Sequence, residues 1–270
     1  SAINQITSVI EDSEGDLWTA TSNGVGYYNT RTKEWKTFLS SHQNKHQTQN
    51  NVFLSLCEST PGTILVGGYM SGMYQINKKD MHPRYFSPQN QGYINIQPDK
   101  YIRSIYRDEQ GNVWAGGYYN FKRIDPISGH IEHYTTDYPI TLITSKNSQE
   151  LWVGTINGIY KFNKSRKKLQ LVNLSSEIGT INSVYQMNDE LTCIGTHGTG
   201  LWIYNNISGK LENYHTKNST LISNNIFCII PGGRPNELIM STESEIVCFN
   251  TQTRRFLNWT KEQGMLTDKF

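Results

Sequence analysis

Short segments in which apolar and polar residues alternate, separated by tight turns, recur along the chain. The clearest example covers residues 6–29, ITSVIEDSEGDLWTATSNGVGYYN. An Asp-x-x-Gly turn begins at Asp12, and an Asn-Gly turn begins at Asn23. Period-two alternation interrupted by such turns is typical of β-hairpins. The pattern therefore predicts three consecutive antiparallel strands, and no segment of the chain has the period of a helix.

This unit is repeated through the sequence. Residues 101–125 and 140–163 are strong copies, and 53–77, 181–205 and 226–250 are weaker ones. The closing Asn or Asp recurs at intervals of 48, 48, 38, 42 and 45 residues, and a further apolar segment follows each time. A period in the forties with four strands per unit predicts an all-β fold, a β-propeller of about six four-stranded antiparallel blades. The predicted blades are approximately residues 3–38, 51–86, 101–134, 139–171, 180–214 and 225–259.

The end of the sequence resembles the start of another unit. Residues 265–270 are similar to residues 221–226, which lead into the sixth unit. We therefore expect residues 1–270 to be one array cut from a seven-bladed propeller or a longer repeat protein. The polar segments 39–51 and 87–100 are predicted to be surface connectors between blades.

The charge composition gives no indication of a nucleic acid or membrane partner. The formal net charge is +2, from 25 basic and 23 acidic residues, which gives no electrostatic footprint for nucleic acid or an anionic membrane. The densest basic run, KSRKK at residues 164–168, falls in a predicted turn between third and fourth strands. No apolar run has membrane-spanning length. We therefore predict that this chain binds no nucleic acid.

The four cysteines lie within predicted strands, mostly where other units place apolar residues. We predict that they are free thiols used as small core residues, and they are Cys57, Cys193, Cys228 and Cys248. No Cys-x-x-Cys spacing is present. The sequence thus predicts no metal, redox centre or cofactor.

No catalytic constellation is evident in the sequence. It lacks the serine-hydrolase, zinc-protease and phosphate-loop motifs. Glu11 and Asp12 are an imaginable acid and base pair, but adjacent strand residues point to opposite faces. Asp12 also starts an Asp-x-x-Gly turn that Asp108 repeats. We predict a turn role for both aspartates, similar to the structural Asp-box hairpin of sialidase propellers.

Aromatic residues fall into two groups. Trp18, Trp114 and Trp152 share one strand position and are predicted to pack between blades. Other aromatic residues occupy turns, where packing does not require them. Together with polar turn residues they form the candidate ligand-binding set of Tyr69, Met70, Tyr118, Tyr119, Asn120, Asn23, Asn157, His197 and Thr199. Aromatic faces beside hydrogen-bonding groups suit a sugar, whereas the alternative is that they cap blades or pack on a neighbouring domain.

The repeats resemble the two-component regulator propeller family, whose unit contains Asp-x-x-Gly, Leu-Trp-x-Gly-Thr and a following Gly. Residues 12–24, DSEGDLWTATSNG, and residues 149–158, QELWVGTING, carry the resemblance most clearly. It extends over essentially the whole chain, but the Trp is missing from the fifth and sixth units. Proteins of this kind are typically the extracytoplasmic sensor regions of hybrid two-component systems.

The resemblance implies a periplasmic, non-enzymatic fragment of a sensor histidine kinase that detects an oligosaccharide. It also implies a neighbouring propeller, a β-sandwich domain and a homodimeric intact sensor, in which ligand shifts the population between arrangements. Two alternatives stay open. One is a structural or protein-interaction propeller without a small ligand, and the other is a lyase-type enzyme using His197 and Glu243.

Overall fold

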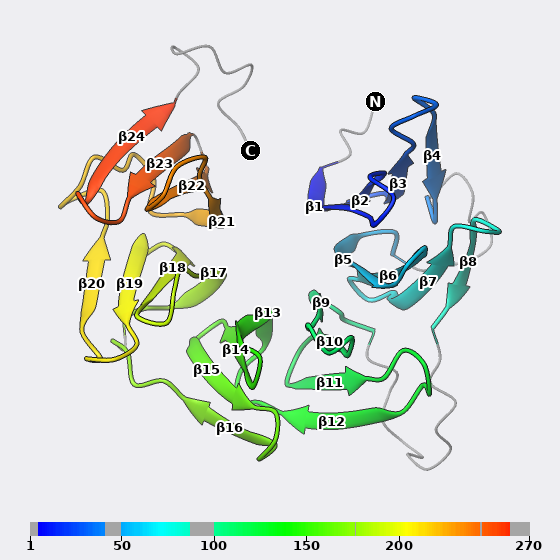
Figure 1. Ribbon diagram of the computed structural model, residues 1–270, viewed down its shortest axis with the longest axis horizontal. Coiled ribbons are helices and arrows are strands. Elements are labelled where there is room, and N and C mark those ends of the chain that lie inside the picture. The colour runs from blue at the N-terminus through cyan, green and yellow to red at the C-terminus, as the bar shows by residue number, and fades with distance from the viewer. Residues whose placement is uncertain (1–4, 41–49, 87–99, 176, 244, 260–270) are drawn as a thin grey trace. The chain divides into compact units, whose positions relative to one another are not determined.

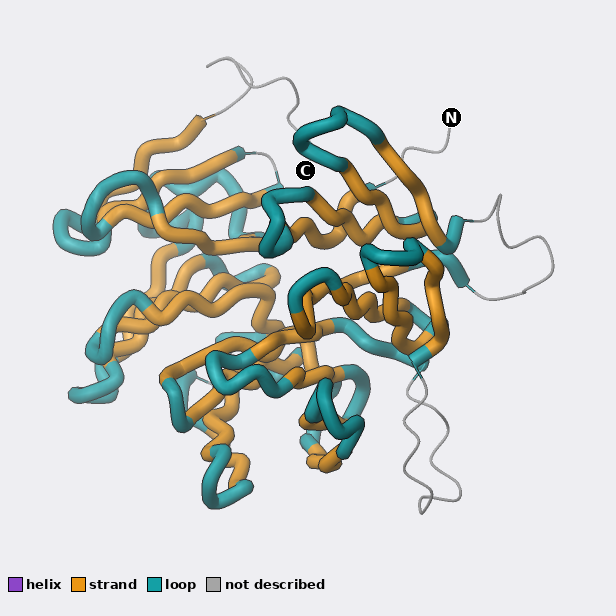
Figure 2. The backbone as a smooth tube through the Cα atoms, turned by 45° about the vertical axis from the view of Figure 1, so that its right-hand side comes forward, coloured by secondary structure: helices purple, strands orange, loops and turns teal. Residues whose placement is uncertain are grey.

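The computed structural model describes residues 5–40, 50–86, 100–175, 177–243 and 245–259. Across these residues the chain forms 24 β-strands in six four-stranded sheets, and neither Figure 1 nor Figure 2 contains a helix in this part. None of the described residues therefore belongs to a helix capable of crossing a membrane. The predicted all-β propeller with six antiparallel blades is confirmed. The predicted repeat start at 265–270 and most of the connectors 39–51 and 87–100 lie outside the described residues.

The chain divides into two compact units, residues 1–143 and 144–270. In every sheet the four strands are hydrogen-bonded in chain order. The first unit contains three complete blades, with strands β1 (Ile6–Glu11), β2 (Leu17–Thr21), β3 (Gly24–Tyr28), β4 (Trp35–Phe38), β5 (Phe53–Thr60), β6 (Thr63–Gly68), β7 (Gly72–Asn77), β8 (His82–Tyr85), β9 (Ser104–Arg107), β10 (Val113–Gly116), β11 (Asn120–Ile124) and β12 (Ile131–Thr135).

The remaining strands belong to the fourth, fifth and sixth blades. They are β13 (Ile140–Asn147), β14 (Glu150–Thr155), β15 (Gly158–Asn163), β16 (Lys168–Leu171), β17 (Thr180–Gln186), β18 (Leu191–His197), β19 (Leu201–Asn205), β20 (Leu211–Tyr214), β21 (Ile226–Pro231), β22 (Glu237–Thr242), β23 (Ile246–Asn250) and β24 (Arg255–Trp259). The basic run at 164–168 begins in the turn between β15 and β16, as predicted, and ends on the first residue of β16.

Asp12 closes the turn between β1 and β2. Its Oδ1 accepts hydrogen bonds from the amides of Glu14 and Asp16, both at 3.0 Å, and its Oδ2 accepts one from Trp18 Nε1 at 2.8 Å. Asp108 makes the equivalent bonds in the third blade, including one from Trp114 Nε1 at 2.9 Å. The predicted turn role of both aspartates is confirmed, and each carboxylate also fixes the tryptophan that follows it.

Trp18 lies at the centre of the packing between the first two blades. It is fully buried in an apolar cluster that includes Val25 and Phe38 of the first blade and Phe53 and Val66 of the second. Trp114 and Trp152 are buried in the same way. The prediction that these three tryptophans are packing residues is confirmed, since burying a large aromatic side chain is among the strongest apolar contributions available.

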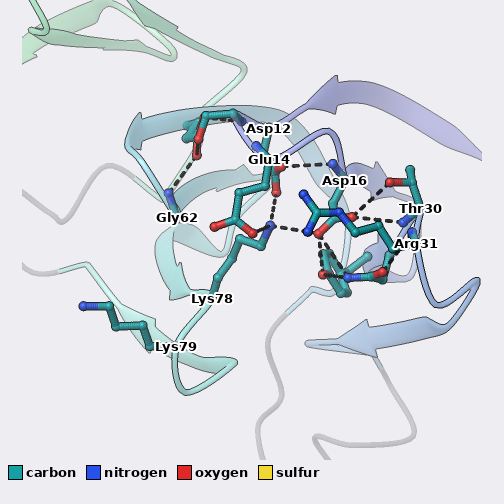
Figure 3. Close-up of polar contacts among 12 residues, drawn as sticks. Asp12, Glu14, Asp16, Thr30, Arg31, Gly62, Lys78 and Lys79 are labelled. Atoms are coloured by element: carbon teal, nitrogen blue, oxygen red, sulfur yellow. Dashed lines mark hydrogen bonds and ion pairs between the residues drawn. The ribbon is translucent and has the colours of Figure 1, made fainter.

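An ionic cluster connects the turn after β1 in the first blade to the turn after β7 in the second blade (Figure 3). Lys78 Nζ, which follows β7, lies 2.8 Å from Asp12 Oδ2 and 2.9 Å from both Glu14 Oε2 and Asp16 Oδ2. The Asp12 side chain is fully buried, and the side chains of Asp16 and Lys78 are 5% and 10% exposed. A buried charge must be paired, so the lysine compensates the two aspartates that the hairpin buries.

The cluster changes the proton affinity of its members. Burial by itself raises the pKa of a carboxyl group, but the hydrogen bonds that each carboxylate accepts from Lys78, from a neighbouring aromatic side chain and from backbone amides together outweigh it, and the pKa of Asp12 and that of Asp16 lie below their usual value of 3.8. Burial by itself lowers the pKa of an ammonium group, yet the three carboxylates raise the pKa of Lys78 above 10.5. All three groups therefore stay charged over the physiological range.

The predicted core position is correct for only two of the four cysteines. All four are free, and Cys57 and Cys193 are buried in apolar clusters. Cys228 is exposed because a β-bulge between Ile226 and Cys228 interrupts the strand alternation. Cys248 is half-buried because it alternates with the buried Val247 and Phe249 and so lies on the other face of β23.

In the second unit, an apolar cluster joins the fifth and sixth blades. Cys193, Leu201 and Ile203 of the fifth blade pack against Met240 and Phe249 of the sixth. At the periphery, Arg254 Nη2 lies 3.2 Å from Glu212 Oε2. This ion pair is partly exposed and contributes little stability compared with the apolar cluster.

Candidate functional site

The turn tyrosines predicted from the sequence lie on the surface of the first unit. Tyr69 and Met70 occupy the turn between β6 and β7, and Tyr118 and Tyr119 occupy the turn between β10 and β11. Their side chains are 41%, 49%, 50% and 55% exposed, respectively. Four large side chains with apolar area are thus presented to solvent at equivalent turns of neighbouring blades. Exposed apolar groups that gather in one place often mark a binding surface.

A tyrosine outside the predicted candidate set connects the two turns. Tyr101, which precedes β9, contacts Tyr69 edge to face, with ring centroids 5.4 Å apart and planes at 80°. On its other side the Tyr101 ring lies 4.6 Å from that of Tyr118, which in turn lies 6.2 Å from Tyr119. We refer to Tyr69, Tyr101, Tyr118 and Tyr119 as the tyrosine row. These spacings are typical of interacting aromatic side chains.

A Gly-Gly-Tyr sequence at each turn explains why the row forms. It occurs at residues 67–69 and again at 116–118. A Cβ atom placed on Gly117 would lie 1.9 Å from the carbonyl oxygen of Tyr101, so only glycine admits the backbone of that residue. The amide of Ile102 donates to the carbonyl of Gly68 at 2.9 Å, which ties the same segment to the preceding blade. Tyr101 is therefore held between the ends of β6 and β10, where these glycines lie.

The loop that follows β12 fixes the other end of the row. Thr136 donates its amide proton to the carbonyl of Tyr119 at 2.9 Å, and Ile140 donates to the carbonyl of Tyr118 at 3.0 Å. Tyr138, in the same loop, is 36% exposed. Backbone hydrogen bonds thus hold Tyr118 and Tyr119 in place, which lowers the entropy lost when a ligand binds.

The remaining candidates of the first unit lie beside turns of the same type. Asn23 is half-buried in the turn between β2 and β3, where its amide donates to Thr21 Oγ1 at 3.1 Å. Asn120 begins β11, directly after Tyr119, and its carbonyl accepts from Gly117 at 3.1 Å. Asn120 therefore helps to close the turn that presents Tyr118 and Tyr119.

The candidates of the second unit occupy corresponding turns but have different surroundings. Asn157 is exposed, and its amide donates to Thr155 Oγ1 at 3.1 Å. The Thr199 hydroxyl lies 2.8 Å from that of Thr196, donates to the carbonyl of Ile178 at 2.9 Å and accepts from Trp202 Nε1 at 3.0 Å. The Thr199 hydroxyl therefore already uses its donor and acceptor positions in hydrogen bonds within the protein.

The two residues considered for a lyase reaction are also in the second unit. His197 is exposed at the end of β18, and Glu243 Oε2 accepts a hydrogen bond from Asn225 Nδ2 at 2.9 Å. The described ranges contain no group of three or more His, Cys, Asp or Glu residues arranged to hold a metal ion. The tyrosine row presents aromatic faces and phenol hydroxyls, and it contains no acid and base pair.

Comparison of the sequence with known families gives a match to the two-component regulator propeller, at residues 2–23 and 96–119. These segments include the Asp12 turn of the first blade and the Gly-Gly-Tyr turn of the third. Two segments of this chain, in its first and third blades, are thus similar to two-component regulator propeller repeats. A search of curated proteins finds no match.

Solved structures share the propeller fold. Two are extracellular domains assigned to hybrid two component systems of B. thetaiotaomicron, with TM-scores of 0.78 and 0.76 and sequence identities of 17% and 16%. They align with 98% and 100% of this chain, which spans only 36% and 35% of their length. A structure of U3-55K is also similar, with a TM-score of 0.71, 8% identity and coverage of 96% and 82%. At these identities the similarity establishes the fold, and function has to be argued from the site.

Proposed function

We propose that this chain is the ligand-sensing propeller region of a hybrid two-component signalling protein and that the tyrosine row binds an oligosaccharide. The observation that carries the proposal is the row itself, in which Tyr69, Tyr118 and Tyr119 are 41–55% exposed yet held in mutual contact through Tyr101. Packing does not account for tyrosines at these turns, because the equivalent turns of the second unit are built without them.

The chemistry of the row fits a sugar. A pyranose ring has an apolar C–H face that lies well on an aromatic ring, while its hydroxyls need donors and acceptors at the edge. Each tyrosine offers both a ring face and a hydroxyl. Three exposed rings along one contiguous row suit an oligosaccharide better than a single monosaccharide.

In the complete protein we expect this region to lie outside the cytoplasm, next to a second propeller and a β-sandwich domain, in a homodimer. Ligand would favour one of two arrangements of the dimer by the difference in its affinity for them, and a histidine kinase would report the change. The family repeats and the two structural relatives from extracellular domains support this placement. The chain itself is proposed to have no enzymatic activity.

A thermal-shift screen against oligosaccharides from plant and host glycans tests the proposal. A ligand that binds only the folded state raises the melting temperature by mass action. The proposal predicts at least one such sugar, with the shift lost in Tyr118→Ala and kept in Trp35→Ala. Trp35 is a matched control because it is an aromatic residue of the same unit, 64% exposed, on β4. A shift that survives Tyr118→Ala, or no shift with any sugar, would contradict the proposal.

A further inference from the structure

A pocket with two arginines in its wall lies between the last strands of the fifth and sixth blades, β20 and β24 (Figure 1). Its volume is about 270 Å³. The wall contains Arg254 and Arg255, the rings of Tyr214 and Phe256, and the segment 218–220. None of its described lining residues is acidic, and none belongs to the tyrosine row. The pocket is therefore a separate site within the second unit.

The two arginines of the pocket carry more positive charge than the neighbouring acid compensates. Arg254 Nη2 lies 3.2 Å from Glu212 Oε2, which also accepts a hydrogen bond from the Tyr214 hydroxyl at 3.1 Å. The other oxygen of Glu212 lies 3.1 Å from Lys210 Nζ. Burial by itself would raise the pKa of Glu212, but Lys210 and Arg254 hold it below its usual value of 4.5. One carboxylate thus serves two cations, and the exposed Arg255 makes no ion pair within the described part of the chain.

The free hydrogen-bonding groups of this wall are mainly donors. Asn218 Oδ1 accepts from the amide of His215 at 2.8 Å, and Asn218 Nδ2 donates to a backbone carbonyl at 2.9 Å. The Ser219 hydroxyl donates to the carbonyl of His215 at 2.8 Å. Arg254 Nη1 is buried and makes no hydrogen bond with any described residue. Because a guanidinium group has only donors, a ligand in this pocket has to supply acceptors or negative charge.

The aromatic side of the wall places an apolar surface beside these donors. The rings of Tyr214 and Phe256 are half-buried, with centroids 5.6 Å apart and planes at 58°. Phe249, which is fully buried, contacts both, at 5.6 Å from Tyr214 and 4.5 Å from Phe256. The two rings are therefore fixed before any ligand arrives, which reduces the entropy lost on binding.

We propose that this pocket binds a small carboxylic acid that contains one ring. Arg255 and Arg254 hold the carboxylate, because the paired N–H donors of a guanidinium group match its two oxygens. The ring of the acid contacts Tyr214 and Phe256. The pocket is smaller than the sites of drug-sized ligands, which limits the ligand to a single ring. Sugar acids and aromatic acids share this chemistry.

Calorimetric titration of the chain with sodium glucuronate and with sodium benzoate tests the inference. At least one of the two acids should bind saturably, and Arg255→Ala should weaken that binding at least about tenfold. Lys168→Ala is the matched control, because Lys168 is an exposed cation that begins β16 as Arg255 begins β24, and it does not line the pocket. Its removal should change the affinity less than about twofold. Melting temperatures of both variants establish that they are folded.

Neutral and inorganic probes separate recognition of the acid from general attraction. Glucose and benzyl alcohol, the neutral counterparts, should bind at least about tenfold more weakly than the acids. Tighter binding of glucuronate would identify a sugar acid and tighter binding of benzoate an aromatic acid, and either supports the inference. Equal binding of the neutral probes or of inorganic sulfate would overturn it. So would equal losses in Arg255→Ala and Lys168→Ala, or no saturable binding of either acid.

The same titration in Tyr118→Ala distinguishes this site from the tyrosine row. Affinity for the acid should stay within about twofold of the wild-type value, because Tyr118 does not line the pocket. A tenfold loss in this variant would place the acid on the tyrosine row and overturn the inference. The test of the proposed function uses Tyr118→Ala with the opposite expectation, so the two proposals can fail separately.

Discussion

The two units of this chain are built from the same four-stranded blade but present different side chains at equivalent turns. In the first unit the turns after β6 and β10 expose Tyr69, Tyr118 and Tyr119, and Tyr101 joins them into a row. In the second unit the corresponding turns carry Asn157, whose amide is bound to Thr155, and Thr199, whose hydroxyl is used internally. The hairpin is the scaffold, and the turn residues decide whether it offers a binding surface.

The contacts between neighbouring blades differ in the same way. The first two blades combine an apolar cluster around Trp18 with the buried charges of Lys78, Asp12 and Asp16. The fifth and sixth blades rely on an apolar cluster that contains Met240 and Phe249. A junction with buried charges is sensitive to the loss of one partner and to the protonation of its carboxylates, whereas an apolar cluster contains no charged group that titrates.

The largest effect is expected from Gly117→Val. A Cβ atom at this position would lie 1.9 Å from the carbonyl oxygen of Tyr101, so the backbone that carries the row must move. We expect a loss of about 4 kcal/mol in the free energy of unfolding, measured by urea titration, together with loss of sugar binding. Gly233→Ala is the control, because a Cβ there meets no atom within 4 Å and should be nearly neutral. Similar losses in the two variants would mean that glycine at 117 has no special role.

Lys78→Met tests the ionic junction. Removing the ammonium group leaves Asp12 and Asp16 buried without their cation, which should cost about 3 kcal/mol of unfolding free energy in urea titrations. Lys79→Met is the matched control, because this neighbouring lysine is exposed and outside the cluster. If both variants lose the same small amount, the cluster does not stabilise the junction.

The difference in unfolding free energy between wild type and Lys78→Met should depend on pH. The pKa values of Asp12 and Asp16 are lowered by folding, so their stabilising contribution is complete above 3.8, their usual pKa, and is lost as the pH falls through the lower folded values. The raised pKa of Lys78 means that its own contribution is complete below 10.5. The stability difference between wild type and Lys78→Met should thus be constant from about pH 6 to 9 and shrink below about pH 4. A difference that persists unchanged in acid would contradict the ionic account.

The smallest effect is expected from His197→Ala. His197 is exposed in the second unit, and the proposed site is complete within the first. Affinity for any sugar found in the thermal-shift screen should therefore change by less than about twofold, measured by calorimetric titration. A tenfold loss would instead extend the binding surface to the second unit.

Local signals in the sequence predicted the blades well. The recurrent turns and the period-two alternation locate the strands, and the Asp-x-x-Gly turns at Asp12 and Asp108 are confirmed by their bonds to the tryptophans. The positions of Trp18, Trp114 and Trp152 followed from the same periodicity. These features depend on residues close together in the chain, which is why a repeat reveals them.

Contacts between blades were not predictable in this way. Tyr101 lies between tyrosines 32 and 17 residues away only because Gly117 admits its backbone. Lys78 reaches carboxylates more than 60 residues earlier, which a repeat pattern does not indicate. The doubled Gly-Gly-Tyr sequence was the one available signal for the row. Cys228 was assigned wrongly to the core because its β-bulge is a feature of strand pairing.

Calorimetric titration of wild type and Tyr101→Ala, with the oligosaccharide that gives the largest thermal shift, tests directly whether the tyrosine row binds the sugar. Tyr101 is the ring that connects Tyr69 to Tyr118, so its removal divides the tyrosine row without changing the three exposed rings. If the row is the binding site, Tyr101→Ala should remain folded and bind the sugar at least about tenfold more weakly, a loss of about 1.4 kcal/mol in binding free energy. An unchanged dissociation constant would contradict this prediction and place the sugar elsewhere.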